Sequence, residues 1–409
     1  MPSDQSTWLI TVPLNGDSEG LLQELTTKLS HQSRSFSPNS IAELGIPSFK
    51  AGTLDSLIAL SEDLPKQDTF FTNTVAKVVD TLRNLLNNDP YKLAQHILVN
   101  ESSIENYLLG QWRWNEGRYG VQKGLGDMVD TLNKEMSSID NAMKSKLQNY
   151  NLVKGSLVQM QRKKTGNLSV KSLADVVSPE DFVLDSEYLE TVLVAVPKSV
   201  PLFLYLAGQK LRVLRNLTKD WNLKYEHLSS MVVPRSSKSI ASDDEYTLFG
   251  VVIFRRVHDE FIQQCRENKF INRDFVYSDT DINKQRQELD MADVTERELW
   301  TELLHLSRTN FSESFQILVH LKVIRLFVES VLRYGLPANY LGIVIQPDPK
   351  SSKKIFNVLQ AHLSYLGSSS RRKGQSKAGD SEEFVGEYQT LMEQEFFDFV
   401  IFEVPWVTQ

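Results

Sequence analysis

The sequence predicts an α+β protein with an elongated, dumbbell-like form: a base domain, a long neck of two antiparallel helices, and an inserted α+β domain at the tip. Three observations predict this organisation. Two distant stretches show long helical periodicity, strand-like runs occur both between and outside them, and the two helical stretches carry opposite charge. The segment between the helices must then lie at the far end of a helical hairpin.

The first helical stretch covers residues 125–165 and contains no proline. Its apolar residues recur at intervals of three or four, close to a heptad seam with one slip at Leu147. A helix of about 40 residues would extend about 60 Å. The apolar positions are Leu132, Met136, Ile139, Met143, Leu147, Tyr150, Val153, Leu157 and Met160.

The second helical stretch covers residues 279–334 and becomes denser in apolar residues toward its C-terminal end. It is predicted to end at Tyr334-Gly335-Leu336-Pro337, because glycine suits the left-handed position after a helix and proline cannot continue it. The apolar positions are Ile282, Leu289, Leu299, Leu303, Leu306, Ile317, Leu321, Ile324 and Val328.

The two helical stretches are oppositely charged. Residues 140–165 contain six basic residues and one acidic residue, whereas residues 279–302 contain eight acidic residues and three basic ones. The simplest interpretation is an antiparallel pair in which each helix covers the apolar stripe of the other and complementary charge sets the orientation. The alternative is that these are two unrelated solvated faces.

Strand-like runs predict one domain between the helices and another outside them. The inner segment contains strand-like runs at Thr191–Val196 and Tyr246–Phe254, a helix start at Ser178-Pro179, and a short helix at His258–Asn268. The outer segments contain strand-like runs at Trp8–Val12, Leu341–Gln346 and Asp398–Val404, and a helical pattern from Phe71 to Leu85. We therefore predict a base domain of residues 1–151 and 300–409, a neck of residues 152–165 and 279–299, and a tip domain of residues 166–278.

Composition argues against several function classes. A net charge of −7 and a pI near 5.6 argue against a nucleic-acid binder, since such domains carry basic surfaces. The single cysteine, Cys265, excludes an internal disulfide and is interpreted as a small helix residue, not a reactive thiol. The N-terminus lacks the features of a secretory signal, so a cytosolic protein is expected. The longest apolar run, Thr191–Gly208, contains Lys198 between two prolines, which argues against a membrane-spanning helix.

The sequence contains no motif for catalysis, cofactor binding or metal binding. Glycine-rich phosphate loops, an HExxH motif and cysteine–histidine clusters are all missing, so we expect no catalytic residue, no cofactor and no metal ion. Three weaker candidates are interpreted structurally: Gly124-Leu125-Gly126 as a turn before the long helix, His320 as a hydrogen-bonded histidine of an apolar face, and Asp243-Asp244-Glu245 as an exposed turn. Arg162-Lys163-Lys164 could bind phosphate or acidic lipid, but a basic helix end or a protein contact is favoured.

Four blocks of the sequence, in this order, resemble a known family. They are IPSFKAGTLDSLIALSEDL (Ile46–Leu64), the run RKKTGNLSVKSLADVVSPEDFVLDSEYLETVLVAVPK (Arg162–Lys198), SMVVPRS (Ser230–Ser236) and FVESVLRYGLPANY (Phe327–Tyr340). The chain resembles the C subunit of the vacuolar-type (V-type) proton-pumping ATPase, most closely its fungal versions. Because the blocks thread most of the chain, the resemblance is to a whole protein.

The resemblance implies a bone-shaped, non-catalytic subunit with a head, a neck and a foot. In this family the head grips a peripheral stalk made of the E and G subunits, and the foot contacts a second stalk and the cytosolic domain of the large membrane subunit, named a. Some members also bind actin. The protein works at the cytoplasmic face of the vacuolar and endomembrane system and is released to the cytosol on reversible disassembly. We place Arg162, Lys163, Lys164, Thr165 and Asn167 among the stalk contacts.

Two rival functions explain the sequence less completely. An enzyme would need a convergent set of titratable groups, and none is visible. A generic coiled-coil scaffold of another cytosolic or actin-binding assembly would explain the neck but not the matching blocks.

The chain departs from the family at two places. One is an insertion at residues 200–218, which is interpreted as a retained intron or as a true insertion. The other is the C-terminal end, because the residues beyond Glu403 differ from the family and are interpreted as a possible misassigned end.

Overall fold

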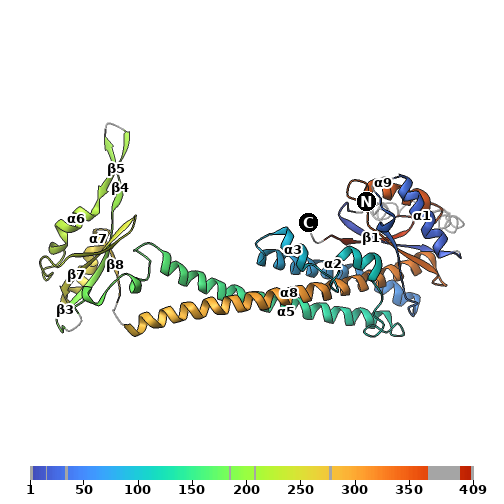
Figure 1. Cartoon of the computed structure of the whole chain (residues 1–409), viewed down its shortest axis with the longest axis horizontal. Helices are drawn as coiled ribbons and strands as arrows, with labels where there is room; N and C mark the ends of the chain where they lie inside the picture. The colour runs from blue at the N-terminus through green and yellow to red at the C-terminus, as the bar shows by residue number, and fades with distance from the viewer. Residues whose placement is uncertain are drawn as a thin grey trace, which may run out of the picture. The chain divides into compact units, whose positions relative to one another are not determined.

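The computed structural model describes residues 3–14, 16–32, 36–183, 186–206, 209–275, 279–366 and 397–406, with only the backbone described at residues 32, 175, 199–206, 209–216 and 279–282. The chain divides into two compact units (Figure 1). Unit 1 comprises Met1–Gln148 and Trp300–Gln409, and unit 2 comprises Asn149–Leu299. The two long helices, α5 (Leu125–Thr165) and α8 (Asp279–Tyr334), each contribute to both units, and their bounds are those predicted from the sequence.

A four-stranded antiparallel sheet forms the centre of unit 1, with the order β10-β1-β9-β2. Its strands are β1 (Ser6–Pro13), β2 (Ile41–Leu44), β9 (Tyr340–Ile345) and β10 (Val400–Pro405). In the register, Trp8 lies opposite both Glu403 and Ile345. The three strands predicted outside the helical stretches are therefore confirmed and pair with one another.

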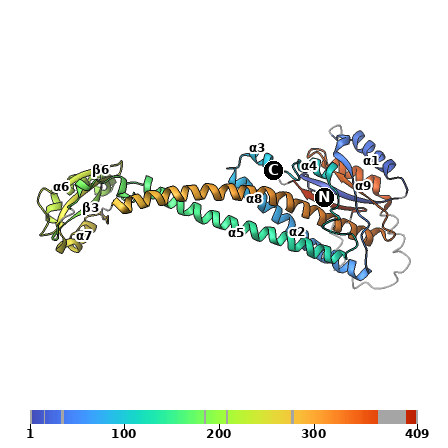
Figure 2. The ribbon, with the colours of Figure 1, turned by 60° about the horizontal axis from the view of Figure 1, so that its bottom comes forward.

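The sheet of unit 1 is covered by helices on both faces. On one face, α1 (Ser18–Gln32) and α9 (Ser352–Leu363) bury an apolar core that includes Trp8, Ile10, Leu25 and Phe356. Figure 2 shows α1 and α9 together beside the sheet. On the other face lies the C-terminal part of α8, where the Ser330 and Thr11 hydroxyls are 2.6 Å apart. The alternation of side chains along β1 thus fills two separate interfaces.

The last residues that the structure describes contribute to this sheet. Val404 on β10 is buried, and the backbone N–H of Trp406 donates to the Gln5 carbonyl at 2.9 Å. The indole Nε1 of Trp406 also donates to the Thr7 hydroxyl at 3.0 Å. Val404 and Trp406, which lie beyond Glu403, therefore contribute to the edge of the sheet.

The other helices of unit 1 pack through apolar residues at helical spacing. In α2 (Leu54–Leu85) the buried positions include Phe71, Val75, Val78 and Leu82, as the sequence pattern predicts. Thr53 caps its N-terminus by accepting from the Ser56 N–H at 3.3 Å. The shorter elements of unit 1 are η1 (Pro38–Ser40), α3 (Pro90–His96), α4 (Ile104–Asn106) and the π-helical η2 (Tyr107–Gln111).

Unit 2 contains a second four-stranded antiparallel sheet, with the order β6-β7-β3-β8. Its strands are β3 (Leu189–Pro197), β6 (Lys238–Ser242), β7 (Tyr246–Phe254) and β8 (Ile271–Arg273). One face is covered by α6 (Leu217–Lys224) and α7 (His258–Glu267), with Trp221 and Phe261 fully buried. The other face is covered by an irregular segment after α5 that buries Leu168, Leu173 and Val177. The short helical turns are η3 (Leu173–Asp175), η4 (Pro179–Asp181), η5 (Tyr225–His227) and η6 (Arg255–Val257).

The predicted insertion at residues 200–218 falls almost entirely on a separate hairpin of unit 2. Strands β4 (Ser199–Leu206) and β5 (Gln209–Asn216) pair with each other as a two-stranded sheet, and Figure 1 shows them extending from the rest of the unit. The apolar run that begins at Thr191 is therefore divided between β3 and β4. Across the described ranges, no helix combines the length and hydropathy that a bilayer span requires.

Candidate functional site

The basic residues singled out in the sequence lie on the last turn of α5. Arg162, Lys163 and Lys164 are exposed there, where positive charge interacts favourably with the C-terminal end of the helix dipole. Gly166 ends the helix, and its N–H donates to the Arg162 carbonyl at 2.9 Å. A Cβ at Gly166 would lie 2.8 Å from that carbonyl oxygen, so the turn favours glycine. This turn leaves the three cationic side chains in solvent.

Thr165 and Asn167 serve the local structure instead. The Thr165 hydroxyl donates to the Gln161 carbonyl at 2.9 Å. The Asn167 side-chain amide donates to Glu245 Oε2 at 2.7 Å, and its carbonyl oxygen accepts from the Ser169 hydroxyl at 2.5 Å. Asn167 therefore ties the segment after α5 to the β6–β7 turn. Arg162, Lys163 and Lys164 thus form an exposed basic turn, whereas Thr165 bonds within its own helix and Asn167 bonds to the β6–β7 turn.

The β6–β7 turn that receives this tether is organised by Asp243. Its carboxylate accepts backbone N–H bonds from Leu168 at 2.6 Å, Glu245 at 2.8 Å and Tyr246 at 2.6 Å. Burial acts to raise the pKa of Asp243, but these N–H donors favour the charged form, and the pKa lies below its ordinary value. The acidic Asp243-Asp244-Glu245 triplet is thus a structural turn, as interpreted from the sequence.

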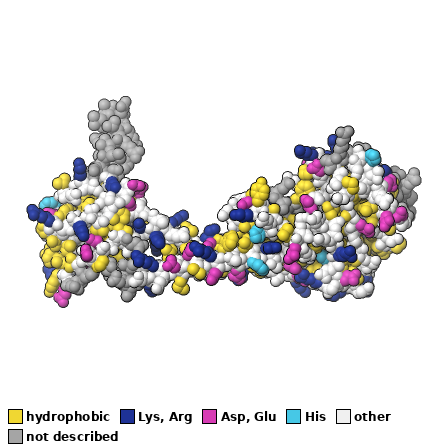
Figure 3. All heavy atoms as spheres, in the orientation of Figure 1, with side chains coloured by type: hydrophobic (Ala, Val, Ile, Leu, Met, Phe, Trp, Pro, Cys, Tyr) yellow, Lys and Arg dark blue, Asp and Glu magenta, His cyan; other side chains and the backbone are white. Residues whose placement is uncertain are grey.

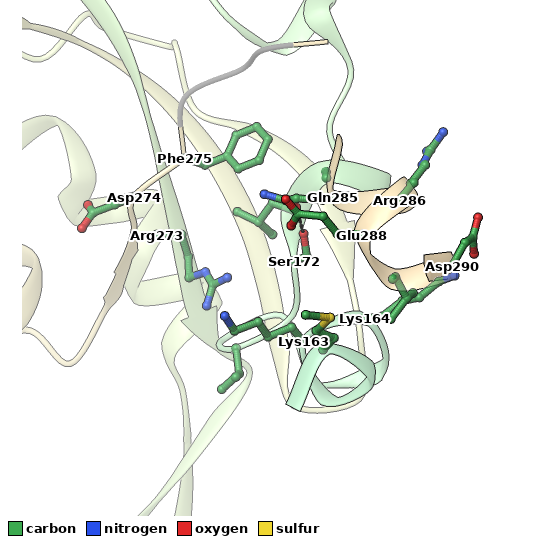
Figure 4. A pocket seen from close by; sticks show the side chains of 15 residues that line it. Lys163, Lys164, Ser172, Arg273, Asp274, Phe275, Gln285, Arg286, Glu288 and Asp290 are labelled. Atoms are coloured by element: carbon green, nitrogen blue, oxygen red, sulfur yellow. Dashed lines mark hydrogen bonds between the residues drawn. The ribbon is translucent and has the colours of Figure 1, made fainter. Parts of the chain in front are cut away.

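A hollow of about 670 Å³ lies beside the basic turn, entirely within unit 2. Its walls come from the end of α5, the irregular segment after it, the end of β8 and the beginning of α8, and Figure 4 shows side chains from all four. Apolar and charged residues share the lining. They are Met160, Lys163, Lys164, Val170, Ser172, Leu173, Ala174, Arg273, Asp274, Phe275, Gln285, Arg286, Glu288, Leu289 and Asp290.

Hydrogen bonds hold the walls of this hollow together. The Ser172 N–H donates to the Lys163 carbonyl, and its hydroxyl donates to Gln285 Oε1 at 3.3 Å. The Arg273 guanidinium donates to the carbonyls of Ser169 and, at 2.6 Å, of Lys171. Burial lowers the pKa of Arg273 from its ordinary value, while the neighbouring Asp274 opposes the shift. Gln285, Glu288 and Asp290 line the hollow from α8, and Figure 4 labels them.

Several charged side chains of the lining are not paired with any residue that the structure describes. Within the described part of the chain, the side chains of Lys163, Lys164, Glu288 and Asp290 have no ion-pair or hydrogen-bond partner. In the space-filling view, acidic and basic side chains are interspersed over α5 and α8 on the face shown (Figure 3). The hollow therefore presents unpaired charge of both signs among apolar side chains.

Elsewhere the two long helices do meet through polar contacts. Lys146 and Glu302 form an ion pair at 2.5 Å, and the Tyr150 hydroxyl donates to Glu296 at 2.9 Å. Within unit 1, the Lys146–Glu302 pair and the contact of Ser307 with Met143 show that α5 and α8 run antiparallel there. Because the Lys146–Glu302 pair is exposed, it contributes little stability and serves mainly to set register.

His320 is a structural residue of unit 1. Its Nδ1–H donates to the Gln316 carbonyl at 2.7 Å, and its Nε2 accepts the Asn115 N–H at 3.2 Å. The rings of Trp114 and Tyr119 lie 4.9 Å and 5.1 Å from the imidazole. Burial lowers the pKa of His320 below its ordinary value. Both ring nitrogens are thus committed to a neutral imidazole, and neither is available as a metal ligand.

The remaining candidates also have structural roles. Cys265 is fully buried on α7, and burial raises the pKa of its thiol to about 12, so the unreactive protonated form dominates. Gly124 lies immediately before α5 and its carbonyl accepts from the Met128 N–H, which makes it part of a helix start. Among the residues that the structure describes, no group of histidine, cysteine and carboxylate side chains is arranged to hold a metal ion.

Two lining residues of the hollow could be found from the sequence, and the others could not. Lys163 and Lys164 were visible as a basic run at a helix end. Glu288 was visible only as part of an acidic stretch, and Arg273 carried no signal, because its importance comes from contacts with carbonyls about a hundred residues away.

Comparison with known proteins places the chain in one family. A family model described as the C subunit of the V-ATPase matches residues 7–202 and 204–400. The V-type proton ATPase C subunit of Caenorhabditis briggsae is 38% identical over 362 residues, which cover 88% of each chain. The V-type proton ATPase C subunit 1-B of Danio rerio is 34% identical over 397 residues, which cover 97% of each chain.

A solved structure gives a weaker match. It is the cytoplasmic N-terminal domain of the I subunit of a V-ATPase, a homologue of the a subunit, with a TM-score of 0.33 and 10% identity, covering 88% of this chain and 97% of that one. The family match, by contrast, runs through both units. Its two matched segments meet within β4, inside the hairpin that the sequence predicts as an insertion. The chain therefore belongs to the family of V-ATPase C subunits.

Proposed function

We propose that the chain is a non-catalytic peripheral-stalk subunit of the V-type proton-pumping ATPase, and that it tethers the ATP-hydrolysing sector to the membrane sector. The observation that carries this proposal is the family match, which extends from residue 7 to residue 400 with a single break. Relatives from nematode and fish bear the name of this subunit, and the match covers most of their length.

The division of labour between the two units belongs to the same proposal. Unit 2 would attach to a stalk made of the E and G subunits, and unit 1 to a second stalk and to the cytosolic domain of the a subunit, with actin as a further partner in some settings. Each unit has its own sheet and its own apolar core, which supports two separate attachment sites. A dumbbell form, with the paired helices as a neck, would keep those sites apart.

A tethering role also fits the chemistry of the chain. The sequence has no phosphate loop, and the titratable groups that could suggest catalysis, Cys265 and His320, are buried in structural roles. The protein would act at the cytoplasmic face of vacuolar and other endomembranes, peripheral to the bilayer, and would be found in the cytosol after reversible disassembly.

Co-purification tests the proposal directly. The full chain, carrying an affinity tag, is isolated from its own cells under conditions that keep the proton pump assembled, and its partners are identified by mass spectrometry. We expect the E, G and a subunits at near-stoichiometric amounts, and loss of organelle acidification when the gene is deleted. Recovery of a different assembly, or ATP hydrolysis by the purified chain alone, would refute the proposal.

A further inference from the structure

The hollow of unit 2 has the dimensions and surface of a binding site. Its volume of about 670 Å³ lies within the range of ligand-binding pockets, roughly 300–1,000 Å³. Its apolar lining includes Met160, Leu173, Phe275 and Leu289. The hydrogen bonds from Ser172 to Gln285 and from Arg273 to Lys171 connect neighbouring walls before any partner arrives. A site that is already ordered loses less conformational entropy on binding.

The charges of the hollow indicate what kind of group fits it. Lys163 and Lys164 on α5 have no charged partner among the described residues, and neither do Glu288 and Asp290 on α8. The positive and negative side chains line the same hollow without an ion pair between them in the part of unit 2 that the structure describes. An occupant with a carboxylate would therefore gain an attraction on the α5 side, whereas the carboxylates of α8 would repel it from the opposite wall.

We propose that this hollow receives an acidic amphipathic segment of a partner protein, which inserts an apolar side chain and places an adjacent carboxylate beside Lys163 and Lys164. The apolar side chains of the lining provide the desolvated contact, and the two lysines fix the orientation. This inference rests on the proposed attachment of unit 2 to the stalk, because that attachment supplies the partner. The partner then contacts the hollow and not the exposed basic turn as a whole.

The chain offers a matched control for this proposal. Arg162 and Lys171 are each adjacent in sequence to a residue that lines the hollow, but they do not line it themselves. The variant pair Lys163→Glu/Lys164→Glu and the control pair Arg162→Glu/Lys171→Glu change the net charge by the same amount. A third variant, Ala174→Trp, fills the hollow without changing charge. Circular dichroism and urea unfolding establish that each full-length variant is folded like the parent chain.

The assay is calorimetric titration of each full-length protein with the heterodimer of the stalk's E and G subunits. We expect Lys163→Glu/Lys164→Glu and Ala174→Trp to weaken the affinity by about tenfold or more, and the control pair by about twofold, because charges outside the contact act only through screened, long-range attraction. Raising the salt concentration should reduce the effect of the lysine variants and leave that of Ala174→Trp unchanged.

The outcomes separate this inference from the proposed function. If the parent chain fails to bind the heterodimer, the stalk attachment is refuted and the hollow proposal falls with it. If the parent chain binds but Lys163→Glu/Lys164→Glu and Arg162→Glu/Lys171→Glu weaken binding equally, the attraction is general and electrostatic, and the hollow is not the binding site. Unchanged affinity in Ala174→Trp would likewise overturn the hollow while leaving the stalk attachment intact.

Discussion

The buried carboxylate of Asp68 should be the most sensitive charged residue of unit 1. Asp68 lies on α2 with 7% of its surface exposed, and its partners Lys322 and Arg325 lie on α8. The Lys322 ammonium is 2.7 Å from Asp68 Oδ1, and the Arg325 guanidinium is 2.6 Å from Oδ2. One carboxylate therefore compensates two cations, of which Lys322 is only 5% exposed.

Replacing Asp68 with alanine should destabilise unit 1 strongly. The substitution leaves the Lys322 ammonium buried without a counter-charge, and removal of one partner from a buried ion pair costs about 3–5 kcal/mol. Burial already lowers the pKa of Lys322, and the nearby Asp68 charge opposes that shift. The matched control is Asp63→Ala on the same helix, since Asp63 pairs with Lys66 at 3.4 Å with both side chains well exposed. That control should cost less than about 1 kcal/mol.

Urea unfolding followed by tryptophan fluorescence measures this difference. Of the six tryptophans, only Trp221 lies in unit 2, so the signal reports mainly on unit 1. We expect a large decrease in the urea midpoint for Asp68→Ala, with partial recovery in the double variant Asp68→Ala/Lys322→Met, which removes the uncompensated ammonium. Equal midpoints for Asp68→Ala and Asp63→Ala would refute the reasoning, because they would show that the Asp68 cluster is no more important than an exposed pair.

Single features of the structure support three further predictions. Because burial lowers the pKa of His320 below 6.5, the unfolded chain protonates this histidine at a higher pH than the folded chain does. The stability contributed by the neutral imidazole is therefore fully present above pH 6.5 and is lost as the pH falls below it, and His320→Gln should reduce this pH dependence of the urea midpoint. Cys265 should react with a thiol reagent only on unfolding, and rapid labelling of the native chain would contradict its burial. Deletion of residues 200–218 should leave a folded, soluble protein, because most of the segment belongs to β4 and β5, which form a sheet of their own, although it also removes the buried Leu217 at the start of α6. Loss of the native circular dichroism spectrum, with these codons present in mature message, would show that the hairpin is a true structural element.

The hairpin of β4 and β5 shows which properties of a segment its composition predicts and which it does not. The apolar-then-basic composition of residues 200–218 distinguished them from their surroundings and led to the prediction of an insertion. Composition did not predict that the segment would form paired strands, since strand pairing depends on two stretches finding each other and not on either one alone. The C-terminal residues show the converse. From the sequence these residues are interpreted as a possible misassigned end, whereas Trp406 bonds to Gln5 and Thr7 through contacts that only the folded sheet provides.

The sequence by itself determined the α+β class, the bounds of α5 and α8, and the family. These properties are local or cumulative: helical periodicity and a Gly-Leu-Pro stop act within a few residues, and the family blocks accumulate along the chain. The tertiary structure decided which polar residues are internal and which are available. It directed Asn167 to Glu245, placed Asp68 against Lys322 across 254 residues, and left Lys163 and Lys164 unpaired beside a hollow. Such pairings depend on long-range packing, which brings distant segments together and sets the burial of each charge, and no local pattern encodes them.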